Sequence, residues 1–205
     1  YEADYNNATQ LIIQNTPPDQ STPTINSTLA TNLSSENLTI FNVSTTDNDS
    51  DSIKNIWDWR LNSSSIAILN MPFEDNNNTN SGTKDYSLLG NNASEYNGIT
   101  WNATGGYDGK GAYVFDGSDD YLGLGDISDI DGATQLSGMA WIKVDDLSTD
   151  LTIMAKDVFN VNAQLLFWRD ETGAISGRTD TVTILVSDGT NDARAEAASG
   201  SLNDN

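Results

Sequence analysis

Carboxylates are the side chains of this sequence most able to carry chemistry. The chain has 30 Asp and Glu residues and contains neither Cys nor His. Thiol nucleophiles, Ser-His-Asp triads and Cys/His zinc sites are therefore excluded from these 205 residues. What remains is the binding of a hard cation by carboxylate oxygens, or acid and base catalysis by a pair of carboxylates.

The first acidic cluster has the spacing of a calcium loop. Asp47, Asp49 and Asp51 alternate along the chain. Asp58 falls at the twelfth position of the same frame, where calcium loops place their last ligand. Three features favour a solvated acidic loop instead: the sixth position is Ser52 rather than Gly, the eighth is Lys54 rather than an apolar residue, and the flanking residues are typical of strands and not of helices.

A second acidic cluster surrounds the turns of the C-terminal half. Because clustered carboxylates repel one another and a hard cation relieves that repulsion, a calcium site is physically reasonable here too. The alternative is that Asp-Gly and Asp-Asp steps are simply good turn formers. The cluster consists of Asp116, Asp119, Asp120, Asp126, Asp129 and Asp131. The first four are the predicted ligands, with Ca²⁺ as the candidate cofactor.

Ten N-x-S/T sequons crowd into the first 102 residues, and none follows. Chance placement would give about four or five, so the excess predicts an exported, surface-displayed chain with a glycosylated N-terminal half. The alternative is an Asn- and Ser-rich loop composition without glycans. The predicted acceptors are Asn7, Asn26, Asn32, Asn37, Asn42, Asn48, Asn62, Asn77, Asn92 and Asn102.

The net charge of -21 argues against several classes of partner. Such a chain repels nucleic-acid phosphates and anionic lipid surfaces alike. No apolar run approaches the roughly 18 residues that a membrane helix needs, so we expect no membrane insertion by this piece. Together with the sequons, these features predict a secreted, extracellular or cell-surface location.

Short apolar runs separated by Asn, Asp, Ser and Gly turns predict antiparallel strands, and helical spacing is not sustained. In the first 70 residues, strands are expected at 38–43, 56–61 and 66–69. Eight more are expected at 99–102, 112–115, 121–124, 135–144, 151–155, 164–169, 181–186 and 193–197. Eight short strands at this spacing favour a sandwich or jelly roll.

Several motifs occur in an order typical of one family. MPFED at 71–75 is followed by GKGAYVFDGSDDYLGLGD at 109–126, LSGMAWIKVDD at 136–146 and TIMAKD at 152–157. Residues 71–205 thus resemble the laminin-G-like (LamG), concanavalin A-like lectin/glucanase domains. The resemblance implies an all-β, antiparallel β-sandwich of the jelly-roll type, incomplete at the C-terminus because the family's Trp-His-His segment is missing. It also implies calcium at one rim of the sandwich.

The stretch before this domain resembles an immunoglobulin-like or PKD-like spacer. The motif that carries this resemblance is TDNDSDSIKNIWDWRLN at 46–62, a Thr-Asp-x-Asp-x-Asp loop before a Trp-containing strand. The predicted organisation is an extended linker at 1–21, a short β segment at 22–70 and a truncated jelly roll at 71–205. We expect the whole to be a piece of a longer protein.

The tryptophans are the candidates for sugar stacking. Trp141 and Trp168 lie inside apolar runs, which predicts core packing for both. Trp57, Trp59 and Trp101 have polar neighbours and are freer to be exposed.

Hydrolysis of glycans is not expected. A glycosidase needs two carboxylates about 5 to 9.5 Å apart. The laminarinase relatives of this fold place theirs in a Glu-x-Asp-x-x-Glu pattern, which is absent here, and the second half has only Glu171 and Glu196.

The leading hypothesis is therefore a non-catalytic module for carbohydrate binding, protein binding or cell adhesion, with a glycan or a surface protein as partner. A glycosylated structural stalk or spacer is one alternative. An accessory binding domain of a polysaccharide-degrading enzyme is another.

Overall fold

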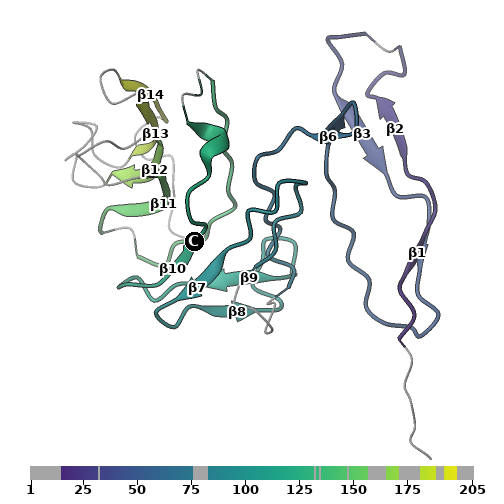
Figure 1. The fold of residues 1–205 in the computed structure, drawn as a ribbon, viewed down its shortest axis with the longest axis horizontal. Helices are drawn as coiled ribbons and strands as arrows, with labels where there is room; N and C mark the ends of the chain where they lie inside the picture. The colour runs from purple at the N-terminus through teal and green to yellow at the C-terminus, as the bar shows by residue number, and fades with distance from the viewer. Residues whose placement is uncertain are drawn as a thin grey trace, which may run out of the picture. The chain divides into compact units, whose positions relative to one another are not determined.

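The computed structural model describes residues 15–31, 33–75, 83–131, 133, 135–146, 148–156, 165–170, 181–187 and 192–197. Its described strands pair antiparallel throughout, and its helical content in these ranges is the single 3-10 turn η1 (Ser128–Ile130). The predicted all-β, antiparallel character is confirmed (Figure 1). The described strands form one four-stranded sheet and several two-stranded pairs, so the jelly roll stays a prediction. The chain divides into two compact units, Tyr1–Trp57 and Asp58–Asn205.

Within residues 15–31 and 33–57, the first unit is held by strand pairing and not by an apolar core. Ser27 is its one buried residue among those described, and Ile25 and Phe41 are about half exposed. The carboxylate of Glu36 accepts hydrogen bonds from the Leu29 N–H and the Thr31 hydroxyl, which fixes the turn between the two longer strands. The pairs are β1 (Asp19–Gln20) with β4 (Thr45–Thr46) and β2 (Thr24–Ser27) with β3 (Leu38–Phe41).

Three short antiparallel strand pairs begin the second unit. Asn62 and Ser63 both have positive φ, 50° and 71°, as the two-residue turn of a tight hairpin requires. Asn tolerates the left-handed region better than most residues, so this turn is encoded locally. The pairs are β5 (Arg60–Leu61) with β6 (Ser64–Ser65), β7 (Ser94–Tyr96) with β10 (Tyr121–Gly123), and β8 (Thr100–Asn102) with β9 (Ala112–Val114).

The buried carboxylate of Asp85 organises the chain between these strand pairs. Asp85 is only 3% exposed. It accepts backbone hydrogen bonds of 2.9 Å from each of Asn70, Ser87 and Asn91, and one of 2.6 Å from the Ser87 hydroxyl. Burial raises the pKa of Asp85, but the hydrogen bonds from Ser87 and the three amides outweigh it, so the net pKa is lowered. One ionised side chain thus ties residue 70 to the loop 85–91.

The segment after residue 70 is fastened to β8 and β9 by close backbone contacts. The Phe73 carbonyl accepts a 2.8 Å hydrogen bond from the indole N–H of Trp101. A Cβ on Gly111 would lie 2.0 Å from the same carbonyl oxygen, so only glycine fits there. The Phe73 ring meets Tyr113 edge-on at 5.5 Å, and the Tyr113 hydroxyl donates to Glu95 at 2.7 Å. These contacts hold both ends of the loop between β8 and β9.

The four-stranded sheet carries the apolar core of the second unit. Leu166, Trp168 and Leu185 form a buried cluster, and Trp168 is 1% exposed. Leu166 and Leu185 are directly opposite in the β12–β13 ladder, so their two apolar side chains lie on the same face of the sheet. The predicted core role of Trp168 is confirmed. The sheet has the order β11 (Leu151–Lys156), β12 (Leu165–Asp170), β13 (Thr181–Ser187) and β14 (Asp192–Glu196).

Some predictions about strands and core were wrong. Residues 135–144 form no strand, and Trp141 is 75% exposed and not a core residue, because no described strand pairs with this segment. The expected strand at 66–69 is absent, and only Arg60 and Leu61 of the 56–61 run are in a strand. An apolar run becomes a strand only where a partner strand satisfies its backbone.

Replacing Asp85 tests whether its buried carboxylate holds residue 70 and the loop 85–91 together. We expect Asp85→Ala to lower the free energy of unfolding at pH 7 by about 3 kcal/mol, since three amides lose their acceptor. A carboxyl group whose pKa is lower in the folded state stabilises the protein at pH values above its unfolded-state pKa. In the wild type this contribution should be lost as the pH falls below about 4 and through the folded-state pKa.

The measurement is urea denaturation followed by tryptophan fluorescence at pH 7 and pH 3. Asp145→Ala is the matched control, because the Asp145 side chain is 93% exposed. Equal stability of the two variants at pH 7 would contradict the role given to Asp85.

Candidate functional site

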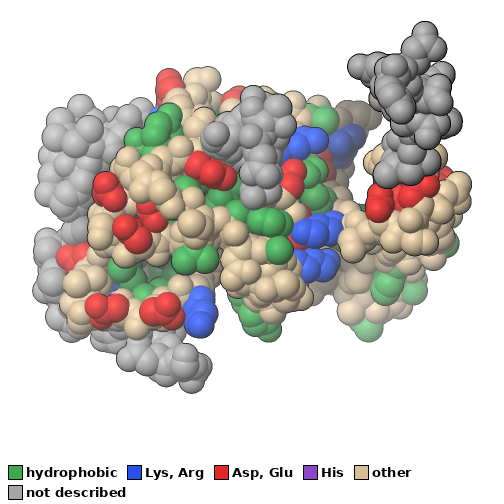
Figure 2. All heavy atoms as spheres, turned by 90° about the horizontal axis from the view of Figure 1, so that it is seen from below, with side chains coloured by type: hydrophobic (Ala, Val, Ile, Leu, Met, Phe, Trp, Pro, Cys, Tyr) green, Lys and Arg blue, Asp and Glu red, His purple; other side chains and the backbone are tan. Residues whose placement is uncertain are grey.

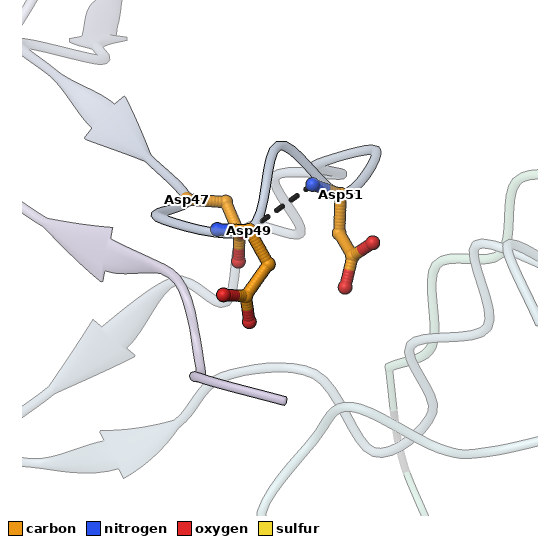
Figure 3. A group of neighbouring side chains, drawn as sticks. All are labelled: Asp47, Asp49 and Asp51. Carbon is orange, nitrogen blue, oxygen red and sulfur yellow. Dashed lines mark hydrogen bonds between the residues drawn. The ribbon is translucent and has the colours of Figure 1, made fainter. Parts of the chain in front are cut away.

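Asp47, Asp49 and Asp51 lie on one side of their loop, with one oxygen of each within 4.8 Å of the others (Figure 3). The Asp47 carboxylate accepts from the backbone N–H groups of Asp49 and Asp51 at 2.8 and 3.2 Å. The backbone N–H and the hydroxyl of Thr16 both donate to Asp49, and they lower the pKa of its carboxyl. The alternating spacing does bring the three aspartates together. Their own hydrogen bonds also hold the turn of the loop.

Asp58, the predicted fourth ligand, is engaged elsewhere. Its carboxylate accepts hydrogen bonds from the Ser65 hydroxyl at 2.6 Å and from the Arg60 guanidinium at 2.8 Å. The Ser65 bond, followed by that of Arg60, lowers the pKa of Asp58. Asp58 thus fastens the hairpin of β5 and β6.

The second cluster brings together Asp116, Asp119 and Asp120, again with oxygens within 4.8 Å of one another. The Asp116 N–H donates to Asp120 at 2.8 Å, and Asp116 accepts from the Ser118 N–H at 2.7 Å. These bonds fold the turn between β9 and β10. The Oδ1 atom of Asp120 is buried and has no hydrogen-bond partner in the described part of the chain. The hydrogen bonds of Asp116 and Asp120 therefore leave one oxygen of each for a cation.

Asp126, the fourth predicted ligand in this half, pairs with a lysine. The Lys156 ammonium lies 2.8 Å from Asp126 and 2.5 Å from Asp131, and it donates to the Ile127 carbonyl at 2.7 Å. The hydrogen bonds to Asp126 and Asp131 raise the pKa of Lys156. The lysine therefore links the residues around η1 to the end of β11.

Seven of the ten predicted sequon asparagines lie in described ranges, and all seven are exposed: Asn26, Asn37, Asn42, Asn48, Asn62, Asn92 and Asn102. Asn7, Asn32 and Asn77 lie outside the described residues. In Asn92 the side-chain oxygen accepts from the Asp85 N–H at 2.9 Å, and in Asn102 it accepts from the Thr104 N–H at 3.0 Å. Both contacts use the oxygen, so they leave the amide nitrogen available to carry a glycan.

The two most exposed aromatic side chains in the described ranges form a stacked pair. The rings of Tyr107 and Trp141 lie 4.3 Å apart between centroids and are inclined by only 9°. Tyr107 is 82% exposed and Trp141 75% exposed. Tyr107 belongs to the loop between β8 and β9, and Trp141 to the segment 135–146. On the face drawn in Figure 2, hydrophobic side chains also reach the surface among acidic ones.

Sequence reasoning placed Trp141 in the core and did not single out Tyr107. The neighbours of Tyr107 in the sequence carry a signal that predicts its exposure. Tyr107 stands between Gly106 and Asp108 in the run TGGYDGKG, a glycine-rich turn that offers no apolar neighbour to cover a ring. An aromatic residue in such a turn is expected to face solvent.

A second stacked pair, Tyr96 and Tyr121, has a structural explanation. The two residues are directly opposite in β7 and β10, with ring centroids 4.6 Å apart and planes inclined by 4°. A Cβ on Gly123 would lie 2.7 Å from the Tyr96 ring, so the glycine makes room for it. Cross-strand aromatic pairs of this kind stabilise short antiparallel strand pairs.

The other tryptophans are less open than Trp141. Trp59 is 38% exposed, whereas Trp57 and Trp101 are half-buried. Trp101 is partly committed to the Phe73 carbonyl. Of the two glutamates weighed as catalytic residues, Glu171 lies outside the described ranges, and Glu196 lies 3.6 Å from Arg194 at the end of β14.

Comparison of the chain with protein-family models, with curated proteins and with solved structures finds no match. The likeness to laminin-G-like domains thus rests on the motifs alone. In the part of the chain that the structure describes, no helix is long and apolar enough to cross a bilayer.

Proposed function

We propose that this chain is a non-catalytic binding or adhesion module of a secreted or cell-surface protein, which contacts a glycan or another surface protein. The observation that carries the proposal is the exposed Tyr107–Trp141 pair. Large aromatic side chains left in water cost free energy in the isolated molecule, and they are enriched at binding surfaces. Three quarters or more of each residue is open to solvent, which suits contact with a ligand.

The proposed architecture is a concanavalin A-like jelly roll of laminin-G-like type. It is supported by the order of the motifs between residues 71 and 157 and by the antiparallel four-stranded sheet, which would form part of one layer.

Export is supported by the exposure of all seven described sequon asparagines. A sugar-coated, strongly acidic surface also fits the rival proposal, a structural stalk or spacer kept soluble by glycans and charge. The spacer gives no reason for an aromatic pair in solvent, so binding is preferred. An accessory domain of a polysaccharide-degrading enzyme would share the same binding chemistry.

A glycan array probed with the purified chain tests the proposed function. A binding module should retain particular sugars above background, and Trp141→Ala should weaken that retention. A parallel array of extracellular-matrix proteins covers the other class of partner. Retention on neither array would favour the spacer.

Glycosylation is tested by intact-mass and peptide mapping after expression in a eukaryotic secretory host. We expect occupancy at the exposed sequons, because the transferase needs access to the asparagine amide during export. Treatment with a glycosidase that converts the modified Asn to Asp should mark each site by a mass change. A secreted chain with every sequon unmodified would contradict the proposal of a sugar-coated N-terminal half.

Calcium support is proposed at Asp116, Asp119 and Asp120. One carboxylate oxygen of each residue lies within 4.8 Å of the other two, and the buried Oδ1 of Asp120 has no hydrogen-bond partner among the described residues. Hard oxygen ligands at a turn suit Ca²⁺, which would neutralise the repulsion between the three carboxylates. The ion would hold the turn between β9 and β10.

The expected result is a rise in Tm of a few degrees in millimolar CaCl₂, because a ligand bound only to the folded state stabilises it. Asp120→Asn should abolish the rise, whereas Asp49→Asn, in the other acidic cluster, should keep it. Differential scanning calorimetry with and without EDTA provides the measurement. A rise that survives in Asp120→Asn would assign the ion to another site.

A further inference from the structure

We propose that the Tyr107–Trp141 pair binds uncharged polysaccharide chains by stacking against their pyranose rings, an inference that rests on the proposed binding function. The two rings are nearly parallel, with centroids 4.3 Å apart. Each ring covers one face of the other, so the remaining exposed area comes mainly from the outer faces and edges. A flat, rigid aromatic face of this kind complements the C–H face of a sugar.

The loop that carries Tyr107 is fixed before any ligand arrives. The Gly106 N–H donates to the Lys110 carbonyl at 2.7 Å, and the Gly109 N–H donates to the Gly106 carbonyl at 2.9 Å. The Asp108 carboxylate accepts from the Lys110 N–H at 3.1 Å. Together these bonds make a closed turn whose ends are held by β8 and β9. A preordered aromatic side chain loses little conformational entropy on binding, which favours a weak ligand such as a sugar.

The charge of the chain determines which sugars are compatible. The net charge is -21. The two lysines within three residues of the pair in the sequence, Lys110 and Lys143, each have a carboxylate oxygen 3.8 Å away, from Asp108 and Asp145. Uronate and sulfate polymers would therefore be repelled, whereas a neutral polysaccharide would not.

A protein partner is the other class of macromolecule that such a pair could contact. Protein interfaces bury apolar side chains of all kinds around an aromatic anchor, and they would recruit Met139, which stands two residues before Trp141 in the chain and is 88% exposed. Sugar stacking needs the flat rings and gives no role to the methionine. The variant Met139→Ala therefore distinguishes a protein ligand, whose binding it should weaken, from a polysaccharide, whose binding it should leave unchanged.

The test measures the affinity of the 205-residue chain for insoluble cellulose and chitin, with polygalacturonate as the anionic comparison. We expect binding to at least one of the two neutral polymers, and weaker binding or none to polygalacturonate. The affinity for the neutral polymer should change little between low and high NaCl, because stacking is not screened by salt. Tyr107→Ala and Trp141→Ala should each weaken binding by about tenfold or more.

Three further variants provide the controls. Tyr107→Phe keeps the ring and should bind like the wild type. Met139→Ala should also leave polysaccharide binding unchanged. Tyr121→Ala removes a ring from the other stack and should have no effect on affinity. Because Tyr107 and Trp141 are largely exposed, their variants should keep the wild-type Tm, which shows that any loss of binding is not a loss of fold.

Several outcomes would overturn the inference. Wild-type affinity in Trp141→Ala, or preference for polygalacturonate, would do so while leaving the proposed function in place. Absence of binding to both neutral polymers, combined with a protein ligand that Met139→Ala and Trp141→Ala both weaken, would replace the sugar with a protein partner. Absence of any ligand in these assays and on both arrays would remove the proposed function as well.

Discussion

The arrangement of the second unit depends on one ionised side chain buried among backbone amides. Asp85 fixes residue 70 against the loop 85–91. The chain continues from residue 70 to Phe73, whose carbonyl is held by Trp101 in β8 and pressed against Gly111 before β9. The loop between those strands presents Tyr107. The position of Tyr107 is thus traceable, contact by contact, to the buried carboxylate of Asp85.

Local sequence predicted the parts of this structure that are local in origin. The short apolar runs at 151–155, 164–169, 181–186 and 193–197 predicted all four strands of the four-stranded sheet almost to the residue. Strands of two or three polar residues, such as β1 and β7, were missed because a period of two cannot be recognised in so few residues. Trp141 was misplaced because burial depends on a partner strand, which the run MAWIKV does not itself specify.

The candidate site shows the same division between near and distant contacts. Asp116, Asp119 and Asp120 were grouped correctly because one turn spans all three. Asp126 was grouped with them by proximity in sequence, but its carboxylate pairs with Lys156, thirty residues further on. Asp85 was not singled out, since a carboxylate between Lys84 and Tyr86 looks like any surface residue until its amide donors are in place. Contacts of long range are set by the assembled chain and cannot be read from spacing.

The close approach of Gly111 to the Phe73 carbonyl separates a part of the molecule that tolerates change from a part that does not. No side chain fits at position 111, and Gly109, two residues earlier, has open space around it but a φ of +76° that other residues rarely adopt. The backbone of the loop is therefore constrained at its glycines, whereas a largely exposed side chain such as Tyr107 can be exchanged without disturbing the frame beneath it. A constrained backbone with a replaceable exposed side chain is an arrangement in which a lineage can vary the surface while inheriting the same scaffold.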